Sequence, residues 1–410
     1  MRIGMPVPFS KAVTDATGGN VKIQRKDFLP EGVLPVIDQG QEDVAGYTND
    51  TSHAYTGDLP VVLFGDHTRA FKYVDEPFAL GADGVKVLAP RAGFNAKFLY
   101  YFFLSSEIPS RGYSRHFKFL KEIAIPLFAP SEQARIVELL DEADRLRRSR
   151  READAKAARI LPALFLKMFG DPATNSMRWP VEPLGVLLRD AEVFVDGDWV
   201  ESKDQDPEGG VRLIQLADIG DGFYIDKSSR FLTKETALRL RCTFLKPRDV
   251  LIARMPDPLG RACIFPGDER EAVTVVDVCV IRPGVDGPDP YWLMHCINSS
   301  GFRALIAQQQ TGTTRARISR GNLSRLPIIC PPTPLQRKFS VLSKQTTEIL
   351  STAGAARKIE QLFELILQRA FSGQLTAKWR EAHLKELVAE MEQQARALNL
   401  PISKELEALP

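Results

Sequence analysis

The sequence predicts a mixed α/β protein with two tandem globular domains, joined by two long helices that pair as an antiparallel coiled coil. The first observation is an internal repeat. The segment that begins at Ile123 recurs at Leu326, and the closing glycines Gly170 and Gly373 keep the same offset of 203 residues. A period of about half of the 410 residues indicates a duplicated domain with its connector and not a solenoid. The second and third observations are the shared order of elements and a heptad pattern.

In each copy, two apolar strands precede a capped helix. The first copy has expected strands at 58–64 and 84–88 and a helix at 96–104, with Asn95 as its N-cap. The second copy has expected strands at 249–253 and 273–281 and a helix at 290–298, with Asp289 as its N-cap.

A heptad pattern follows each globule, in which apolar side chains recur at alternating steps of three and four. The predicted seam residues are Ile136, Leu139, Leu146, Ile160, Leu164, Phe339, Leu342, Ile349, Phe363 and Leu367. Arg150 and Glu360 are polar positions of this seam. The alternative is two independent amphipathic helices, each packed on its own globule.

The chain therefore divides into five expected segments. These are a first globular domain at 1–122, a first arm at 123–170, a second globular domain at 171–325, a second arm at 326–375 and an amphipathic tail helix at 376–410. We expect the tail to act as an intramolecular strap.

Composition limits the class of protein. A hydrophobic content of 44% is enough for real cores, and a net charge of +2 neither demands nor excludes a nucleic-acid partner. The cysteines form no C-x-x-C pair, so we interpret them as reduced core residues of a cytosolic protein. They are Cys242, Cys263, Cys279, Cys296 and Cys330. The apolar runs are too short to span a bilayer, so we expect a soluble, cytoplasmic protein.

Catalytic motifs are absent from the sequence. It contains no G-x-G-x-x-G, P-loop or H-E-x-x-H motif and no [N/D]-P-P-[Y/F] box for methylation of an amino nitrogen. Asp190, Glu201 and Lys203 form the nearest pattern to a magnesium-dependent nuclease, but such loose patterns arise by chance in long chains. The histidines lack ligand spacing. We therefore expect no catalytic residue and no metal site.

Basic clusters are the candidate DNA contacts. The segment 311–325 holds four arginines and no acid, and its hydroxyls and glycines suit phosphate contact. Related clusters precede the first arm and follow the strands at 58–64 and 249–253. The predicted DNA-binding residues are His67, Arg69, Arg115, Lys118, Arg254, Arg261, Thr313, Thr314, Arg315, Arg317 and Arg320. The alternative is a solvated basic face.

These motifs together resemble the specificity subunit of type I restriction-modification systems over nearly the whole chain. The stretches at 35–40, 249–254 and 312–314 are similar to its target-recognition domains, and those at 130–133, 169–172 and 369–375 to its helical connectors. The second connector departs from the pattern because Leu335 stands where the first has Glu132.

The resemblance implies that each globule recognises one half of a split double-stranded DNA site. It implies that the arms act as a ruler and dock methyltransferase subunits, two per chain, and restriction/translocase subunits in the full complex. S-adenosylmethionine, ATP and Mg²⁺ would then belong to the partners, with no cofactor on this chain. The alternatives are a DNA-binding enzyme with an unrecognised nuclease or methyltransferase site, and a coiled-coil scaffold without DNA.

Overall fold

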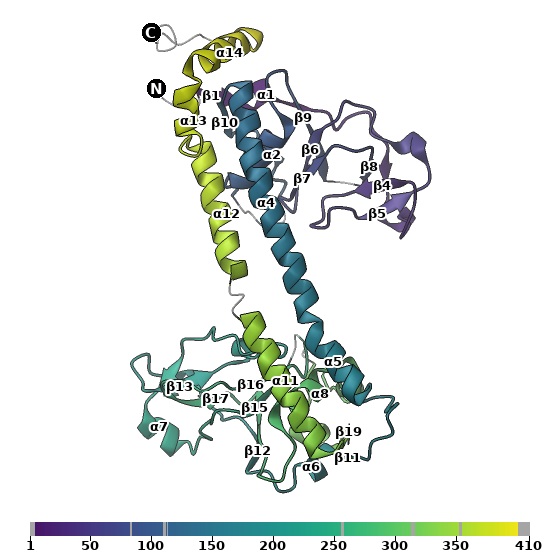
Figure 1. Ribbon diagram of the computed structural model, residues 1–410, viewed down its shortest axis with the longest axis vertical. Coiled ribbons are helices and arrows are strands. Elements are labelled where there is room, and N and C mark those ends of the chain that lie inside the picture. Colours follow the sequence, from purple (N-terminus) through teal and green to yellow (C-terminus); the bar gives the residue numbers. More distant parts are fainter. Residues whose placement is uncertain are drawn as a thin grey trace. The chain divides into compact units, whose positions relative to one another are not determined.

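The computed structural model divides the chain into two compact units (Figure 1). Unit 1 is Met1–Glu152 with Gly354–Pro410, and unit 2 is Ala153–Ala353. The structure describes residues 5–82, 84–109, 112, 114–255, 258–312, 316–351 and 355–400. No helix in these ranges is both long enough and apolar enough to cross a membrane.

Unit 1 contains two four-stranded sheets. The antiparallel sheet has the order β2 (Val13–Asp15), β9 (Val85–Pro90), β6 (Val61–Gly65) and β7 (Phe71–Val74). The second sheet has the order β3 (Lys22–Ile23), β8 (Ala79–Gly81), β4 (Leu34–Ile37) and β5 (Gly46–Thr48). Helix α2 (Ala96–Ser105) covers the first sheet and shares its core.

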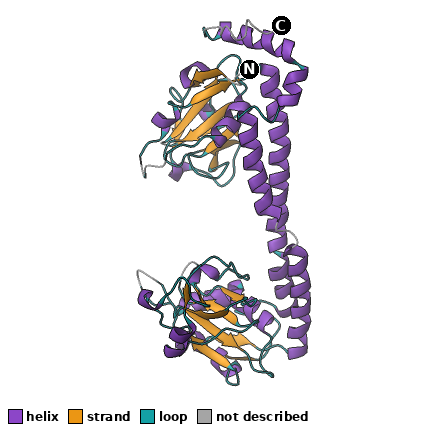
Figure 2. Ribbon diagram, turned by 90° about the vertical axis from the view of Figure 1, so that its left-hand side faces the viewer, coloured by secondary structure: helices purple, strands orange, loops and turns teal. Residues whose placement is uncertain are grey.

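Unit 2 repeats this plan. Its antiparallel sheet has the order β12 (Val193–Asp196), β18 (Val278–Arg282), β15 (Val250–Ala253) and β16 (Ala262–Ile264). A three-stranded sheet follows, with the order β14 (Phe231–Leu232), β13 (Val211–Ile214) and β17 (Glu271–Thr274). Strands β13 and β17 are parallel, as are β4 and β8 in unit 1. The duplication inferred from the sequence is therefore present in the strand order. Figure 2 shows the strands and helices of each unit.

Short elements complete each unit. The chain that enters a globule pairs with the start of its connector, as β1 (Met5–Pro8) with β10 (Ala124–Leu127) and β11 (Val181–Pro183) with β19 (Pro327–Ile329). The shorter helices are α1 (Phe9–Ala12), α3 (Phe117–Leu120), α6 (Leu184–Leu187), α7 (Lys234–Arg239), α8 (Pro290–Asn298), α9 (Ser300–Gln308) and α10 (Arg320–Arg325).

Both predicted N-caps are confirmed. The Asn95 side chain accepts hydrogen bonds from the backbone N–H groups of Lys97 and Phe98, at 2.8 and 3.1 Å. The Asp289 carboxylate accepts from those of Tyr291 and Trp292, at 2.9 and 3.3 Å. Each cap satisfies backbone donors that the first helical turn leaves without partners.

The single strand expected at 273–281 is wrong. The chain leaves β17 after Thr274, turns with the Val278 N–H bonded to the Val275 carbonyl at 3.0 Å, and enters β18. Strand β17 pairs with β13, whereas β18 pairs with β12 and β15. The continuous apolar run at 273–281 therefore contributes one strand to each of two sheets.

A buried glutamine attaches each connector to its globule. The Gln133 amide oxygen accepts from the Asn95 N–H at 2.8 Å, and its nitrogen donates to the carbonyls of Gly93 and Phe128, at 2.9 and 2.8 Å. The Gln336 amide oxygen accepts from the Asp289 N–H at 2.9 Å, and its nitrogen donates to the Pro331 carbonyl at 2.8 Å. Each amide therefore holds the N-cap residue of the helix that covers the sheet.

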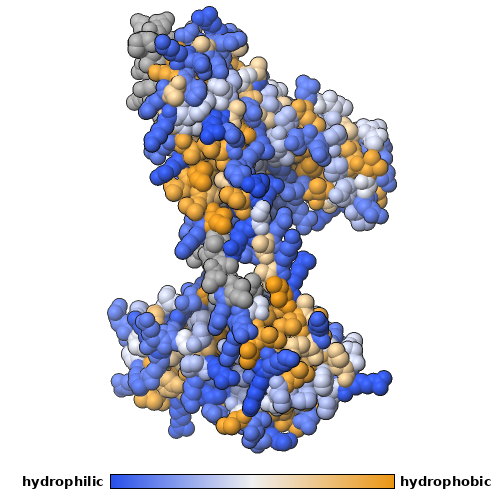
Figure 3. Space-filling model, in the orientation of Figure 1, coloured by the Kyte–Doolittle hydropathy of each residue, from blue (hydrophilic) through white to orange (hydrophobic). Residues whose placement is uncertain are grey.

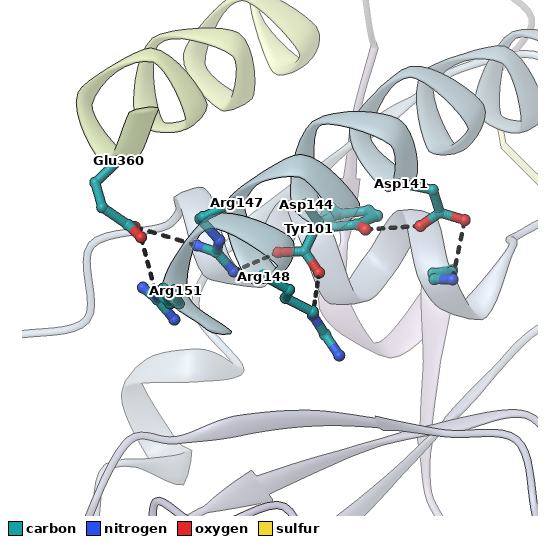
Figure 4. A network of polar contacts seen from close by, with 8 residues as sticks. Tyr101, Asp141, Asp144, Arg147, Arg148, Arg151 and Glu360 are labelled. Carbon is teal, nitrogen blue, oxygen red and sulfur yellow. Dashed lines mark hydrogen bonds and ion pairs between the residues drawn. The ribbon is translucent and has the colours of Figure 1, made fainter. Parts of the chain in front are cut away.

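The connector helices pair within the units. In unit 1, α4 (Pro130–Ala158) lies beside α12 (Ala355–Phe371) (Figure 1). Glu360 pairs with Arg151 at 2.7 Å and with Arg147 at 3.7 Å, in a network that Figure 4 shows. Glu132, at the start of α4, instead meets Arg380, which follows α12. The start of α4 thus contacts residue 380, whereas residues 147 and 151 farther along α4 contact residue 360. The two helices are therefore antiparallel.

In unit 2, α5 (Ile160–Phe169) packs on α11 (Thr333–Ser351). The rings of Phe165 and Phe169 lie 5.6 and 5.5 Å from the Phe339 ring, measured between centroids. All three side chains are buried in the core of unit 2.

The predicted seam register of the first arm is wrong in part. The buried side of α4 passes through Gln133, Ile136, Leu140 and Asp144, while Leu139 is half-buried. Leu146 and Ile160, two expected seam residues, are 54% and 48% exposed. The buried side of α4 differs because α4 also packs against α2, where Asp141 accepts from Tyr101 Oη at 2.7 Å and Lys97 Nζ at 2.9 Å. Ile160 lies in α5, beyond the end of α4. Burial and the Asp141 hydrogen bond raise the pKa of Tyr101, so the hydroxyl stays a donor.

The other predicted seam residues vary in burial. Phe339, Phe363 and Leu367 are buried, and Leu164 and Leu342 are half-buried. The side chain of Ile349 lies outside the described part of the chain.

The tail packs on unit 1, as expected for a strap. It contains α13 (Ala377–Ala382) and α14 (Leu384–Ala397). The buried Glu132 carboxylate accepts hydrogen bonds from Thr376 Oγ1 at 2.6 Å and from Arg380 Nη2 at 2.6 Å. This ion pair is 3% exposed on the glutamate side and 10% on the arginine side, so it anchors the tail inside the unit.

We predict that Arg380→Met destabilises unit 1 by about 3 kcal/mol, because it leaves the buried Glu132 carboxylate without its cation. Urea unfolding together with hydrogen exchange of α13 and α14 measures the change. Arg396→Met is the matched control, since Arg396 is 70% exposed and its pair with Glu392 spans 3.8 Å. Equal stability of the two variants would show that the buried pair does not anchor the tail.

Candidate DNA interface

The basic segment 311–325 of unit 2 contacts the end of β12 through Arg320. Arg317 is exposed, and its backbone pairs with that of Thr311 through hydrogen bonds of 2.8 and 2.9 Å. Arg320 donates to the Phe194 carbonyl at 3.3 Å and lies 3.7 Å from the Asp196 carboxylate. Both guanidinium groups remain accessible to a ligand. Thr313, Thr314 and Arg315 lie outside the described residues.

Arg254 and Arg261 hold loops together, which corrects their assignment as DNA contacts. Each is 8% exposed. The Arg254 guanidinium donates to the carbonyls of Val276 and Ile318 and lies 3.3 Å from Asp196. Arg261 donates to the carbonyls of Ile219 and Leu216, at 2.6 and 2.9 Å. Loop carbonyls buried at the strand end need donors, and these arginines supply them.

The predicted contacts of unit 1 are all exposed: His67, Arg69, Arg115 and Lys118. They come from two segments that meet at Asp66. Its carbonyl accepts from the His116 N–H at 2.9 Å, and its carboxylate accepts from the Phe117 N–H at 2.7 Å. In unit 2 the Arg254 carbonyl likewise accepts from the Ile318 N–H at 3.1 Å. The turn after the central strand and the segment before the short helix are therefore neighbours in both units.

Several residues near these loops were not predicted from the sequence. Asp66 and His116 join the two segments of unit 1, and Asp196 faces both Arg254 and Arg320 in unit 2. Trp199, three positions after Asp196, is 70% exposed. The recurrence of an acid at the end of both edge strands, Asp15 and Asp196, was a usable signal.

No catalytic arrangement is found among the described residues, and no group of three or more His, Cys, Asp or Glu side chains there is placed to hold a metal ion. Glu201 and Lys203 form a surface ion pair at 2.6 Å, which lowers the pKa of the Glu201 carboxyl, while Asp190 pairs with Arg189 at 3.2 Å. The expectation of core cysteines is confirmed for four of the five. Burial raises the pKa of Cys263 and of Cys279 to about 12, so both stay as thiols.

Two curated proteins that resemble this chain are both specificity subunits of type I restriction enzymes. The specificity subunit of the type I restriction enzyme EcoR124I/EcoR124II of Escherichia coli is 24% identical over 356 residues, which cover 82% of this chain and 86% of the relative. The EcoBI specificity subunit of the same organism is 23% identical over 401 residues, which cover 87% and 82%. The resemblance inferred from the motifs is thereby confirmed. No family model matches the chain.

A solved structure shows the same fold. The crystal structure of a type I restriction-modification S subunit from M. genitalium superimposes with a TM-score of 0.56 at 13% identity. The superposition covers 90% of this chain and 96% of that one.

We predict that Arg317→Ala with Arg320→Ala weakens binding of this chain to duplex DNA. If both contact phosphates, the slope of log K against log salt should fall by roughly two, whereas a lost base contact costs about 1–3 kcal/mol at one base pair. Fluorescence anisotropy over a salt series measures both quantities. Lys378→Ala, an exposed change on α13, is the control. Unchanged affinity and slope in a folded double variant would refute the assignment.

Proposed function

We propose that this chain is the DNA sequence-specificity subunit of a type I restriction-modification complex. It recognises a bipartite DNA target and docks methyltransferase subunits and, in the full complex, restriction/translocase subunits. It performs no catalysis itself and acts in the cytoplasm. The observation that carries the proposal is the duplication of one sheet-and-helix fold, with exposed cations at the same strand end in each copy, in a chain whose relatives are specificity subunits.

The two globules are the target-recognition domains, and the two connectors form the antiparallel coiled coil between them. The antiparallel contacts of α4 with α12 and the packing of α5 on α11 support this architecture. The proposed DNA contacts are the exposed cations of both units together with 313–315. Arg254 and Arg261 shape the loops and do not contact DNA.

The connectors also carry the proposed docking face. Leu362 and Leu365 of α12 are 54% and 44% exposed, and Figure 3 shows apolar side chains gathered there. Val341 of α11 and Leu146 of α4 are 56% and 54% exposed. Exposed apolar side chains grouped on helices favour a protein partner. S-adenosylmethionine, ATP and Mg²⁺ are held by the partner subunits.

Specificity is expected to be modular. Replacing the second globule with that of a relative should change one half of the recognised site and leave the other half unchanged, because each globule has its own core. Sequencing of methylated bases in cells that express the chimera with the methyltransferase measures the site. Simultaneous change of both halves would contradict two independent domains.

The arms are expected to set the spacer between the half-sites. Seven residues inserted after Arg150 and after Ala353, which lies outside the described residues, preserve a heptad repeat, and each helical insert adds about 10.5 Å. Since DNA rises about 3.4 Å per base pair, the preferred spacer should grow by roughly three base pairs. Insertion into one arm alone should impair activity, because the pairing slips.

The methylation motif of the double-insertion variant tests this prediction. The added base pairs also rotate one half-site, so weaker activity alone is compatible with a ruler. An active variant with an unchanged spacer would show that the arms do not measure distance.

A further inference from the structure

In unit 1, the tail helix α14 occupies a specific seat. Gln394 Nε2 donates to the Gly93 carbonyl, and the Glu390 carboxylate accepts from Ser131 Oγ at 2.8 Å and from its N–H at 2.9 Å. Lys11 Nζ of α1 donates to the Leu398 carbonyl at 3.1 Å. The apolar face of the helix, with Leu387 and Met391, packs on Ala129. The seat thus joins the loop before α2, the start of α4 and the end of α1.

The corresponding region of unit 2 borders a pair of cavities, although Pro332 and Pro334, the counterparts of Ala129 and Ser131, line neither. Gly287 precedes the cap Asp289 by two positions, as Gly93 precedes Asn95. Val186 is the third residue of α6, as Lys11 is of α1, and Thr333 begins α11 as Pro130 begins α4. Cavities of about 620 and 140 Å³ adjoin at Gly287 and Pro288, and Thr333 lines the larger and Val186 the smaller. We call these two cavities the unit 2 seat.

The larger cavity of the unit 2 seat combines an excess of cations with exposed apolar side chains, whereas the smaller cavity has mainly acidic charged residues. Lys246, Arg248, Arg337 and Lys344 line the larger cavity. Glu192 is 3.8 Å from Lys246, Asp289 is 3.9 Å from Arg248, and Arg282 is neutralised by Asp249 at 2.6 Å. Val285 and Val341 are 88% and 56% exposed beside these charges. An occupant with acidic residues flanking an apolar face would match the larger cavity.

The position of the seat argues against DNA as its occupant. In the pairing of β12 with β18, Val193 lies opposite Arg282, while Asp196 lies opposite Cys279. Arg282 therefore marks the strand end at the seat, and Asp196 marks the end that carries Arg254 and Arg320. The seat is at the opposite end of the sheet from the candidate DNA interface, so a protein is the better match.

The tail of a second copy fits the seat poorly. In unit 1 the tail is anchored by the buried pair of Arg380 with Glu132. At the corresponding position the second connector has Leu335, which packs against the apolar core. A tail placed on unit 2 would leave its arginine without a carboxylate, which is costly in a buried site.

We propose that the unit 2 seat binds an acidic amphipathic helix of the methyltransferase partner, in the manner in which α14 fills the equivalent seat of unit 1. This inference rests on the proposed function, which supplies the partner. Because the chain fills one seat itself, the two methyltransferases bind through unequal contacts, and only the one at unit 2 uses the seat.

Charge reversal on α11 tests the inference in the full chain. Arg337→Glu with Lys344→Glu changes two seat residues one heptad apart, and Lys203→Glu with Lys227→Glu is a control with the same change of net charge on exposed side chains. Native mass spectrometry without DNA counts the methyltransferases bound to each chain. We expect two for wild type and for the control, and loss of one, with its affinity lowered about tenfold or more, for the seat variant.

Carbodiimide cross-linking of the wild-type complex identifies the occupant. Cross-links from Lys246 and Lys344 to acidic residues of one methyltransferase helix are expected. Either of two results would overturn this inference without affecting the proposed function. One is a folded seat variant that binds two methyltransferases with wild-type affinity, and the other is cross-links to 384–398 of a second copy. A wild-type chain that binds no methyltransferase would overturn the proposed function, and this inference with it.

Discussion

The buried glutamine at the start of each connector is the interaction on which the architecture depends. Gln133 and Gln336 each bind the N-cap residue of the helix that covers the sheet and a carbonyl of their own segment. A buried amide is stable only when its donors and acceptor are satisfied, so the connector can leave the globule in few directions. The direction of each arm is therefore fixed by its globule. The proposed recognition of a split DNA site by two globules requires such rigid attachment.

The differences between the copies are as informative as their likeness. Glu132 and Leu335 occupy matching positions, and each suits its surroundings: the glutamate binds the tail arginine Arg380, while the leucine packs into an apolar core. The tail thus covers a surface of unit 1, whereas the corresponding region of unit 2 borders open cavities.

Much of this fold followed from local sequence rules, because caps, strand ends and repeats act over a few residues. Asn95 and Asp289 satisfy the first turns of their helices, and the central strands lie close to their expected positions. The failures share one cause, which is tertiary context. The run at 273–281 forms two strands, because its two halves pair in different sheets. The buried side of α4 differs from the expected seam, because α4 also contacts α2. The burial of Arg254 and Arg261 depends on loop carbonyls distant in sequence, which no local pattern reveals.

We propose above all that two linked domains of one chain recognise one split DNA site. Mapping methylated bases in cells that express this chain with its methyltransferase tests this most directly. We predict a motif of two short specified halves separated by an unspecified spacer of fixed length, present only when the chain is expressed. A continuous motif, or the same methylation without the chain, would contradict it.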